Sequence, residues 1–187
     1  MGLRPRHFDR LTMTGRNRRG DARWERASEE HRNAVRGFAA TARGLAPEAW
    51  SRPRAPGKWS PAQVAEHLVL AYEVIGRELD GGEGARIVVT GWRQRVLRWV
   101  VLPHVLFHRS FPLRAVSPRE TRPHEASADR AAVLERMCTL ADRVEHGLAA
   151  RRDARLTHPY FGPVPALTAL RFCAVHVEHH RRQIAAP

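Results

Sequence analysis

Residues 166–184 read ALTALRFCAVHVEHHRRQI, and the organisation of the rest of the chain follows from this stretch. Its apolar residues recur with a period of 3.6, which predicts a single helix. His176 and His180 are four residues apart, so their rings project from the same face one turn from each other. Two neutral imidazoles in this arrangement can bind one transition-metal ion. A metal site also requires a third ligand, from another helix.

The best candidate for the third ligand is His67, in a helix expected from residue 61 to residue 80. Ser60, Pro61 and Gln63 predict the start of this helix, because they combine a serine cap, a proline in the first turn and a capping-box glutamine. His67 lies within the apolar stripe and should point at the core. The alternative is a hydrogen-bonded core histidine that binds no metal, and the sequence leaves both open.

A second pair of histidines, His104 and His108, repeats the same spacing and competes for the role of metal site. The pair falls in a helix expected at residues 91–108, which Pro103 should kink or divide. The sequence suggests no third ligand for it. Tryptophan and valine are interspersed with arginine along this helix. We expect a bundle helix with an arginine-covered outer face, although a membrane-surface helix has the same pattern.

The remaining segments complete an all-α organisation. Helices are expected at residues 29–45 and 127–152, and apolar residues of the second repeat with the 3, 4, 3, 4 spacing of a bundle helix. A long proline-rich crossover is expected at residues 111–126, and a turn-rich segment at residues 158–165 leads into the last helix.

Charge and composition restrict the function. The net charge is +13, almost wholly from arginine, since Lys58 is the only lysine. Residues 1–26 are basic and lack apolar periodicity, which predicts a disordered tail before a domain at residues 27–187. The arginines are dispersed and are not interleaved with aromatic residues, so we do not expect nucleic-acid binding.

Apolar runs and cysteines point to the cellular compartment. No apolar run is long enough to cross a membrane and no signal-type segment is present, so we expect a cytoplasmic protein. Cys138 and Cys173 fall on apolar helix faces, which predicts reduced core thiols. Cys173 lies one turn before His176, and a role beside the metal is the alternative.

Two motifs resemble the DinB-like superfamily. Residues 59–68 read WSPAQVAEHL and are similar to a helix of that superfamily that opens on Trp-Ser and carries a histidine. Residues 158–162 read HPYFG, and together with the His-x-x-x-His-x-x-Gln pattern of residues 176–183 they resemble the superfamily's ending, especially in a branch of unknown function. The resemblance implies a four-helix bundle that holds a divalent metal through three histidines near one end.

The resemblance also implies the ligands and the class of reaction. The metal ligands carry over to His67, His176 and His180. Zinc is the metal expected for three imidazole ligands, and nickel, iron or manganese are the alternatives. Some relatives are thiol S-transferases that use a low-molecular-weight thiol, and one is a thiol-dependent isomerase. We therefore expect a thiol transferase, or a related metal-assisted hydrolase or isomerase, that acts on a small molecule. Gln183 is expected to orient a ligand, and Tyr160 to serve as a donor at the bundle end.

A non-catalytic helical binding module is the alternative function. The positive charge, the basic tail and the amphipathic helix at residues 91–108 would let such a module associate with an anionic membrane or with nucleic acid. Homodimer formation through the helices is compatible with either function.

Overall fold

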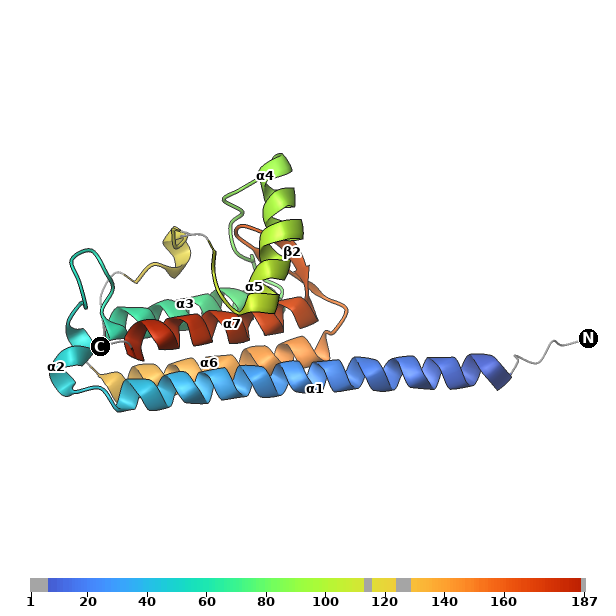
Figure 1. Ribbon diagram of the computed structural model, residues 1–187, viewed down its shortest axis with the longest axis horizontal. Coiled ribbons are helices and arrows are strands. Elements are labelled where there is room, and N and C mark those ends of the chain that lie inside the picture. Colours follow the sequence, from blue (N-terminus) through green and yellow to red (C-terminus); the bar gives the residue numbers. More distant parts are fainter. Residues whose placement is uncertain (1–6, 113–115, 124–128, 186–187) are drawn as a thin grey trace, which may run out of the picture.

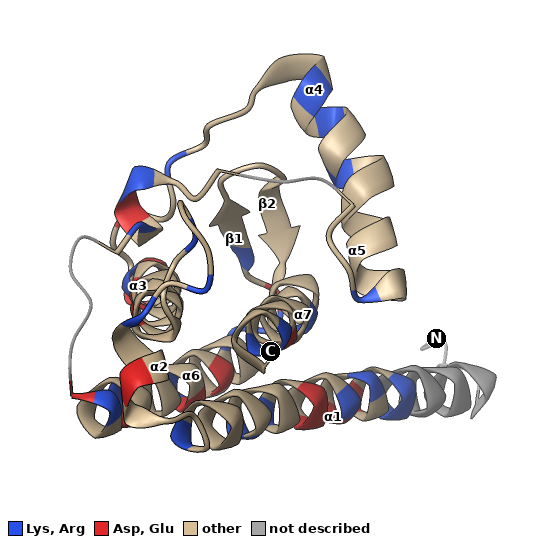
Figure 2. Cartoon of the chain, turned by 60° about the vertical axis from the view of Figure 1, so that its left-hand side comes forward, with Lys and Arg blue, Asp and Glu red and all other residues tan. Residues whose placement is uncertain are grey.

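The computed structural model describes residues 7–112, 116–123 and 129–185. Four long helices pack side by side and form a bundle (Figure 1). In Figure 2, which views the bundle from nearer its end, α1 lies beside α6 and α7, and α3 lies across from α1. The all-α four-helix bundle expected from the sequence is confirmed. The helices are α1 (His7–Arg43), α3 (Pro61–Leu79), α6 (Arg130–Ala150) and α7 (Ala166–Ala185).

Helix α3 begins at the predicted residue. The Ser60 hydroxyl accepts the Gln63 backbone N–H at 3.2 Å, and the Gln63 side-chain oxygen accepts the Ser60 N–H at 2.9 Å. Pro61 occupies the first turn, where a missing N–H costs no helical hydrogen bond. This reciprocal cap fixes the phase of the helix, so that His67 faces the bundle interior together with Val64 and Leu68.

Helix α1 is much longer than the sequence indicated. Residues 7–26, which we predicted to be part of a disordered tail, are helical, and residues 1–6 lie outside the described part of the chain. Trp24 accounts for part of the difference, because its side chain is only 6% exposed and belongs to the core. The Arg152 guanidinium lies 5.1 Å from the Trp24 ring centroid and covers it. Long-range packing therefore overrides the weak local periodicity of this stretch.

A buried polar network joins three of the four helices. With a neutral imidazole, His31 of α1 donates from Nδ1 to Glu145 of α6 at 3.0 Å and accepts the Tyr72 hydroxyl of α3 at 2.7 Å. Arg32 donates to the other Glu145 oxygen at 2.6 Å. Burial alone would raise the pKa of Glu145, but the hydrogen bond from His31 and the charge of Arg32 hold it below its ordinary value. This satisfied network fixes how α1, α3 and α6 lie relative to one another.

The chain between α3 and α6 leaves the bundle and forms a helical rod, residues 91–108. Leu102 donates its N–H to the carbonyl of Leu97, five residues back, and so closes a π turn directly before Pro103. The wider turn accommodates the proline ring, and this is the predicted disruption at Pro103. Rod and crossover consist of α4 (Gly91–Val96), η1 (Leu97–Val101), α5 (Leu102–His108) and the 3-10 turn η2 (Arg119–Thr121). The predicted linker at residues 111–126 falls partly outside the described residues.

The rod stands away from the bundle instead of lying along it (Figure 1). Our expectation of an arginine-covered outer face was wrong, because Trp92, Trp99 and Phe107 are 69%, 73% and 81% exposed. The residues that hold the rod in place are Leu102 and Val105, which are buried. None of the described helices is both long enough and apolar enough to cross a membrane.

A short hairpin stands where the sequence indicated only turns. Strands β1 (Arg155–His158) and β2 (Gly162–Pro165) pair antiparallel, with buried Leu156 opposite buried Val164. Gly162 ends the turn with a φ of 66°, which L side chains rarely adopt. The short helix α2 (Pro47–Ser51) follows α1, with Pro47 in its first turn.

Candidate metal centre

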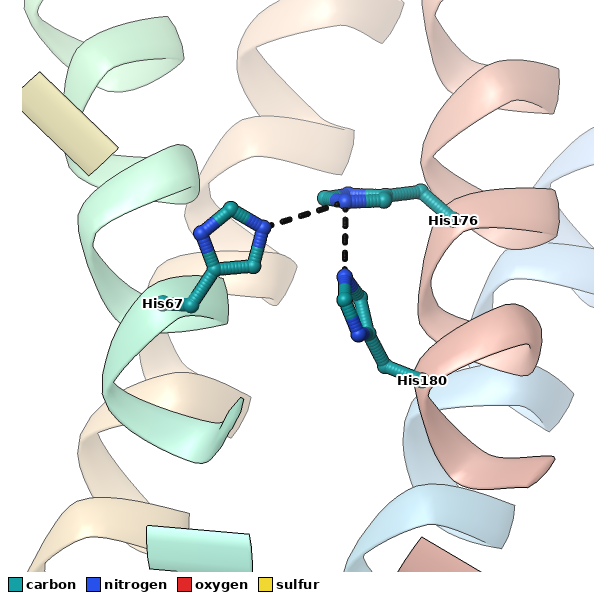
Figure 3. A group of neighbouring side chains, drawn as sticks. All are labelled: His67, His176 and His180. Carbon is teal, nitrogen blue, oxygen red and sulfur yellow. Dashed lines mark hydrogen bonds between the residues drawn. The ribbon is translucent and has the colours of Figure 1, made fainter. Parts of the chain in front are cut away.

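Three imidazoles from two helices point at one position in the bundle (Figure 3). His67 comes from α3, and His176 and His180 come from successive turns of α7. Nε2 of His176 lies 3.2 Å from Nε2 of His67 and 3.0 Å from Nε2 of His180. The nearest ring nitrogens of all three lie within 4.8 Å of one another. The structure thus brings together the three residues that the sequence analysis selected.

Hydrogen bonds on the far side of two rings fix where their protons sit. Nδ1 of His67 donates to the carbonyl of Thr121 at 2.6 Å, and Nδ1 of His180 donates to the side-chain oxygen of Gln183 at 2.8 Å. Both partners are carbonyl-type oxygens and can only accept, so Nδ1 carries the proton in each neutral ring. Nε2 of His67 and Nε2 of His180 therefore present lone pairs to His176.

The donor set fits a divalent ion. Nε2 of His176 faces two acceptor nitrogens and can donate one proton to only one of them, so one lone pair is left without a donor. A cation at this position would accept all three lone pairs. Two nitrogens bound to one ion at roughly 2.0–2.1 Å in tetrahedral geometry lie about 3.3 Å apart. The observed separations of 3.2 and 3.0 Å are close to that value.

The environment keeps all three rings neutral. Burial lowers the pKa of His67, although its hydrogen bond to Thr121 acts in the opposite direction. Burial, and then the proximity of the other imidazoles, holds the pKa of His176 well below its ordinary value. The same two causes lower the pKa of His180 to about 3. Because a metal binds the neutral form of imidazole, the rings need not lose protons at neutral pH before binding one.

The three rings border a cavity of about 920 Å³, which we call the central cavity. Its walls come from α3, α7, the hairpin and the crossover, and they are mostly apolar and aromatic. None of the described residues that line it is Asp or Glu, whereas Arg54 and Lys58 both contribute to the lining. A cavity of this size is large enough for a small organic molecule. Representative lining residues are Ile75, Leu97, Val101, Phe111 and Phe172.

Comparison with known proteins identifies the family of the chain. A family model described as the DinB superfamily matches residues 28–184, which extend from α1 to the end of α7. The chain belongs to the DinB superfamily. Searches of curated proteins and of solved structures gave no match. The resemblance drawn from residues 59–68 and 158–183 is thereby confirmed for the family.

In this DinB-superfamily chain, His158 is a cavity residue to which the sequence analysis assigned no role of its own. Its Nδ1 accepts the backbone N–H groups of Tyr160 and Phe161 at 3.2 and 3.3 Å, so the proton of the neutral ring is on Nε2. The ring stacks on Phe161 with centroids 4.3 Å apart. Burial lowers the pKa of His158 to about 3, and the residue stays a neutral N–H donor across the physiological range.

The weaker site predictions have definite positions. Gln183 accepts from His180 and donates to Nε2 of His179 at 2.9 Å, so its amide holds two rings of α7. The Tyr160 hydroxyl donates to the carbonyl of Val116 and ties the hairpin to the crossover at the edge of the central cavity. Gln183 thus has the contact expected of an orienting residue, whereas the Tyr160 hydroxyl already has a partner within the protein.

The competing histidine pair and the cysteines do not form a second centre. The His104 and His108 rings lie 4.3 Å apart on the exposed side of α5, and no third metal-ligating residue joins them in the described ranges. Cys138 and Cys173 are both free thiols. Burial raises the pKa of Cys173 to about 12, so this thiol stays protonated even though it borders the central cavity.

Proposed function

We propose that this protein is a divalent-metal-dependent enzyme in which His67, His176 and His180 are the ligands. The observation that carries the proposal is the convergence of their Nε2 atoms, with separations of 3.2 and 3.0 Å, at the wall of the central cavity. Three protein ligands leave a coordination position open, which is typical of catalytic rather than structural sites. Zinc is the proposed metal, and nickel, iron and manganese also accept imidazole ligands.

The proposed reaction is transfer of a low-molecular-weight thiol to an electrophilic small molecule. When bound, a divalent ion supplies a Lewis acid that lowers the pKa of a thiol or a water that reaches it. Hydrolysis commonly also uses a carboxylate as general base, and no described cavity residue is Asp or Glu. A thiol has less need of a base, because its ordinary pKa of about 8.5 is already close to neutral. These points favour thiol transfer over metal-assisted hydrolysis.

Other residues of the chain would bind and orient the reactants. Gln183 holds His180 in place, and the Thr121 carbonyl does the same for His67. Arg54 and Lys58 supply positive charge that suits a thiol carrying carboxylates. The neutral His158 ring is an N–H donor for the substrate, whereas the Tyr160 hydroxyl would have to release the Val116 carbonyl before it could donate.

Metal analysis of tag-free protein tests the metal site. We expect about one equivalent of divalent metal per chain, at purification or after reconstitution, and less than roughly a tenth of an equivalent in His176→Ala. His104→Ala is the matched control, because it removes an exposed histidine of the other pair and should leave the metal content unchanged. Wild-type protein that takes up no metal on reconstitution would refute the proposal.

A second assay separates the possible reactions. Metal-loaded protein is incubated with cellular thiols and a panel of electrophiles, and thiol consumption is followed with His176→Ala as the blank. Thiol-dependent turnover supports S-transfer. Hydrolysis of activated esters without thiol would favour a hydrolase. Metal binding with neither reaction would leave a binding module as the better account.

A further inference from the structure

The exposed large hydrophobic side chains gather on one segment of the described chain. This segment comprises the described residues 84–112 and 116–119 and is called the basic apolar segment. Single exposed apolar residues are common on proteins, but a continuous group of them marks an interaction surface. The exposed residues are Ile87, Val88, Trp92, Val96, Trp99, Val100, Phe107 and Val116.

The same segment carries charge of one sign. Its described residues contain six arginines and no aspartate or glutamate. Figure 2 shows arginine and no acidic residue along α4 and α5. The Arg93 guanidinium lies 5.7 Å from the Trp92 ring centroid, and that of Arg98 lies 5.8 Å from the Trp99 ring centroid. Exposed tryptophan beside arginine is therefore a repeated feature of this surface.

The rod is apolar on two opposite sides. Leu97 and Val101 line the central cavity on the inner side. Trp92, Trp99 and Phe107 are exposed, and the rod that carries them projects away from the bundle (Figure 1). A helix with apolar residues on two opposite sides is normally covered on both of them, by protein or by lipid. The described chain covers only the inner side of this one.

We propose that the basic apolar segment docks the protein on an anionic phospholipid membrane. Trp92, Trp99 and Phe107 enter the interfacial region, where aromatic side chains are favoured, and the flanking arginines bind lipid phosphates. Binding is peripheral, since none of the described helices could cross a membrane. Because Leu97 and Val101 form a cavity wall, docking brings the central cavity next to the lipid, and this does not depend on a bound metal.

Two other partners fit these residues less well. A two-fold homodimer would place the segment against itself, with arginine facing arginine and no acidic residue of the segment to neutralise the charge. Nucleic acid offers phosphates for the arginines but no apolar layer for Val96, Val100 and Phe107. An anionic bilayer satisfies both the charge and the apolar side chains.

Vesicle flotation of the full-length protein tests the proposal. We expect binding to phosphatidylcholine vesicles that contain roughly 30% phosphatidylglycerol, at least about tenfold weaker binding to pure phosphatidylcholine, and weaker binding at high salt. Tryptophan emission should shift to shorter wavelength on binding, because Trp92 and Trp99 leave water while Trp24 and Trp50 are already buried.

The apolar contribution is tested with the triple variant Trp92→Ser/Trp99→Ser/Phe107→Ser. All three side chains are exposed, so the variant should fold, as circular dichroism would verify. It should lose at least about tenfold in vesicle affinity.

The charge contribution has a matched control. Arg93→Gln/Arg95→Gln should weaken binding to anionic vesicles by about tenfold or more. Arg18→Gln/Arg19→Gln removes the same charge from exposed positions of α1 and should leave binding unchanged.

Several results would overturn the proposal. Wild-type protein that binds no vesicles, or a triple variant that binds them as well as wild type does, would exclude this surface as the docking site. A wild-type dimer in light scattering that the triple variant dissociates would assign the face to a second copy. Duplex DNA binding that depends on the same three side chains would assign it to nucleic acid.

Discussion

Acidification should destabilise the metal-free protein, and His158 should account for a definable part of the loss. Burial lowers the pKa of His158 in the folded state to about 3, whereas an unfolded histidine titrates near about 6.5. Between these values the unfolded chain binds a proton that the folded chain does not. Stability therefore rises with pH in this window, and is lost as pH falls below about 6.5.

The size of the effect follows from the two pKa values. A pH of about 5 lies roughly 1.5 units below the pKa of the unfolded histidine. Protonation of this residue therefore stabilises the unfolded state by about 2 kcal/mol at that pH. Other buried histidines add to the total loss, so the contribution of His158 is obtained by difference. The variant His158→Asn isolates it, because the asparagine oxygen can accept the N–H groups of Tyr160 and Phe161 without titrating.

The assay is urea unfolding followed by circular dichroism, with a chelator present, at about pH 7.5 and about pH 5. This range stays above the region in which Glu145 and Glu178 titrate, since the pKa values of both are lowered in the folded state. The variant should lose about 2 kcal/mol less than wild type between the two pH values. Equal losses in the two proteins would show that His158 is not buried as a neutral ring.

Four further outcomes follow from the structure. Gln183→Leu removes the acceptor for His180 Nδ1 and should weaken metal affinity by about 10–100-fold, as measured by chelator competition. Unchanged affinity would mean that the amide does not orient the ring. Phe38→Ala empties a fully buried core position and should cost about 3–5 kcal/mol in urea unfolding, and a cost below roughly 1 kcal/mol would contradict the packing. Ser60→Ala breaks the capping box and should lower the free energy of unfolding by about 1 kcal/mol in the same assay. An unchanged free energy of unfolding would mean that water replaces the hydroxyl fully. The Cys173 thiol should resist alkylation in native protein and react once the protein is unfolded in urea, so rapid native labelling would argue against its burial.

Local signals located the helix start and the histidine pair of the candidate site. The start of α3 depends on Ser60, Pro61 and Gln63, which act within one helical turn, so the sequence alone determines it. The i, i+4 spacing of His176 and His180 likewise needs only a regular helix. Placement of His67 opposite them required the relative position of two helices, and this came from the family resemblance rather than from the residues.

The elements that the sequence missed depend on contacts between distant segments. Trp24 is buried by the bundle and by Arg152, which lies far away in the chain, so no local pattern marks residues 7–26 as helical. The hairpin pairs Leu156 with Val164 across a short turn, and neither strand is long enough to show an alternating pattern. The sequence pattern of the rod is amphipathic, but only the structure shows that its tryptophans face outward.

The polar network of His31, Tyr72 and Glu145 has a consequence for how this protein could change over evolution. It fixes α1, α3 and α6 relative to one another, so it holds the helix that carries His67, and it shares no residue with the walls of the central cavity. Part of those walls comes from the crossover and the hairpin, which lie outside the four-helix bundle. Descendants of this chain could therefore acquire new ligands by exchanging connecting segments, while the three-histidine cluster stays intact.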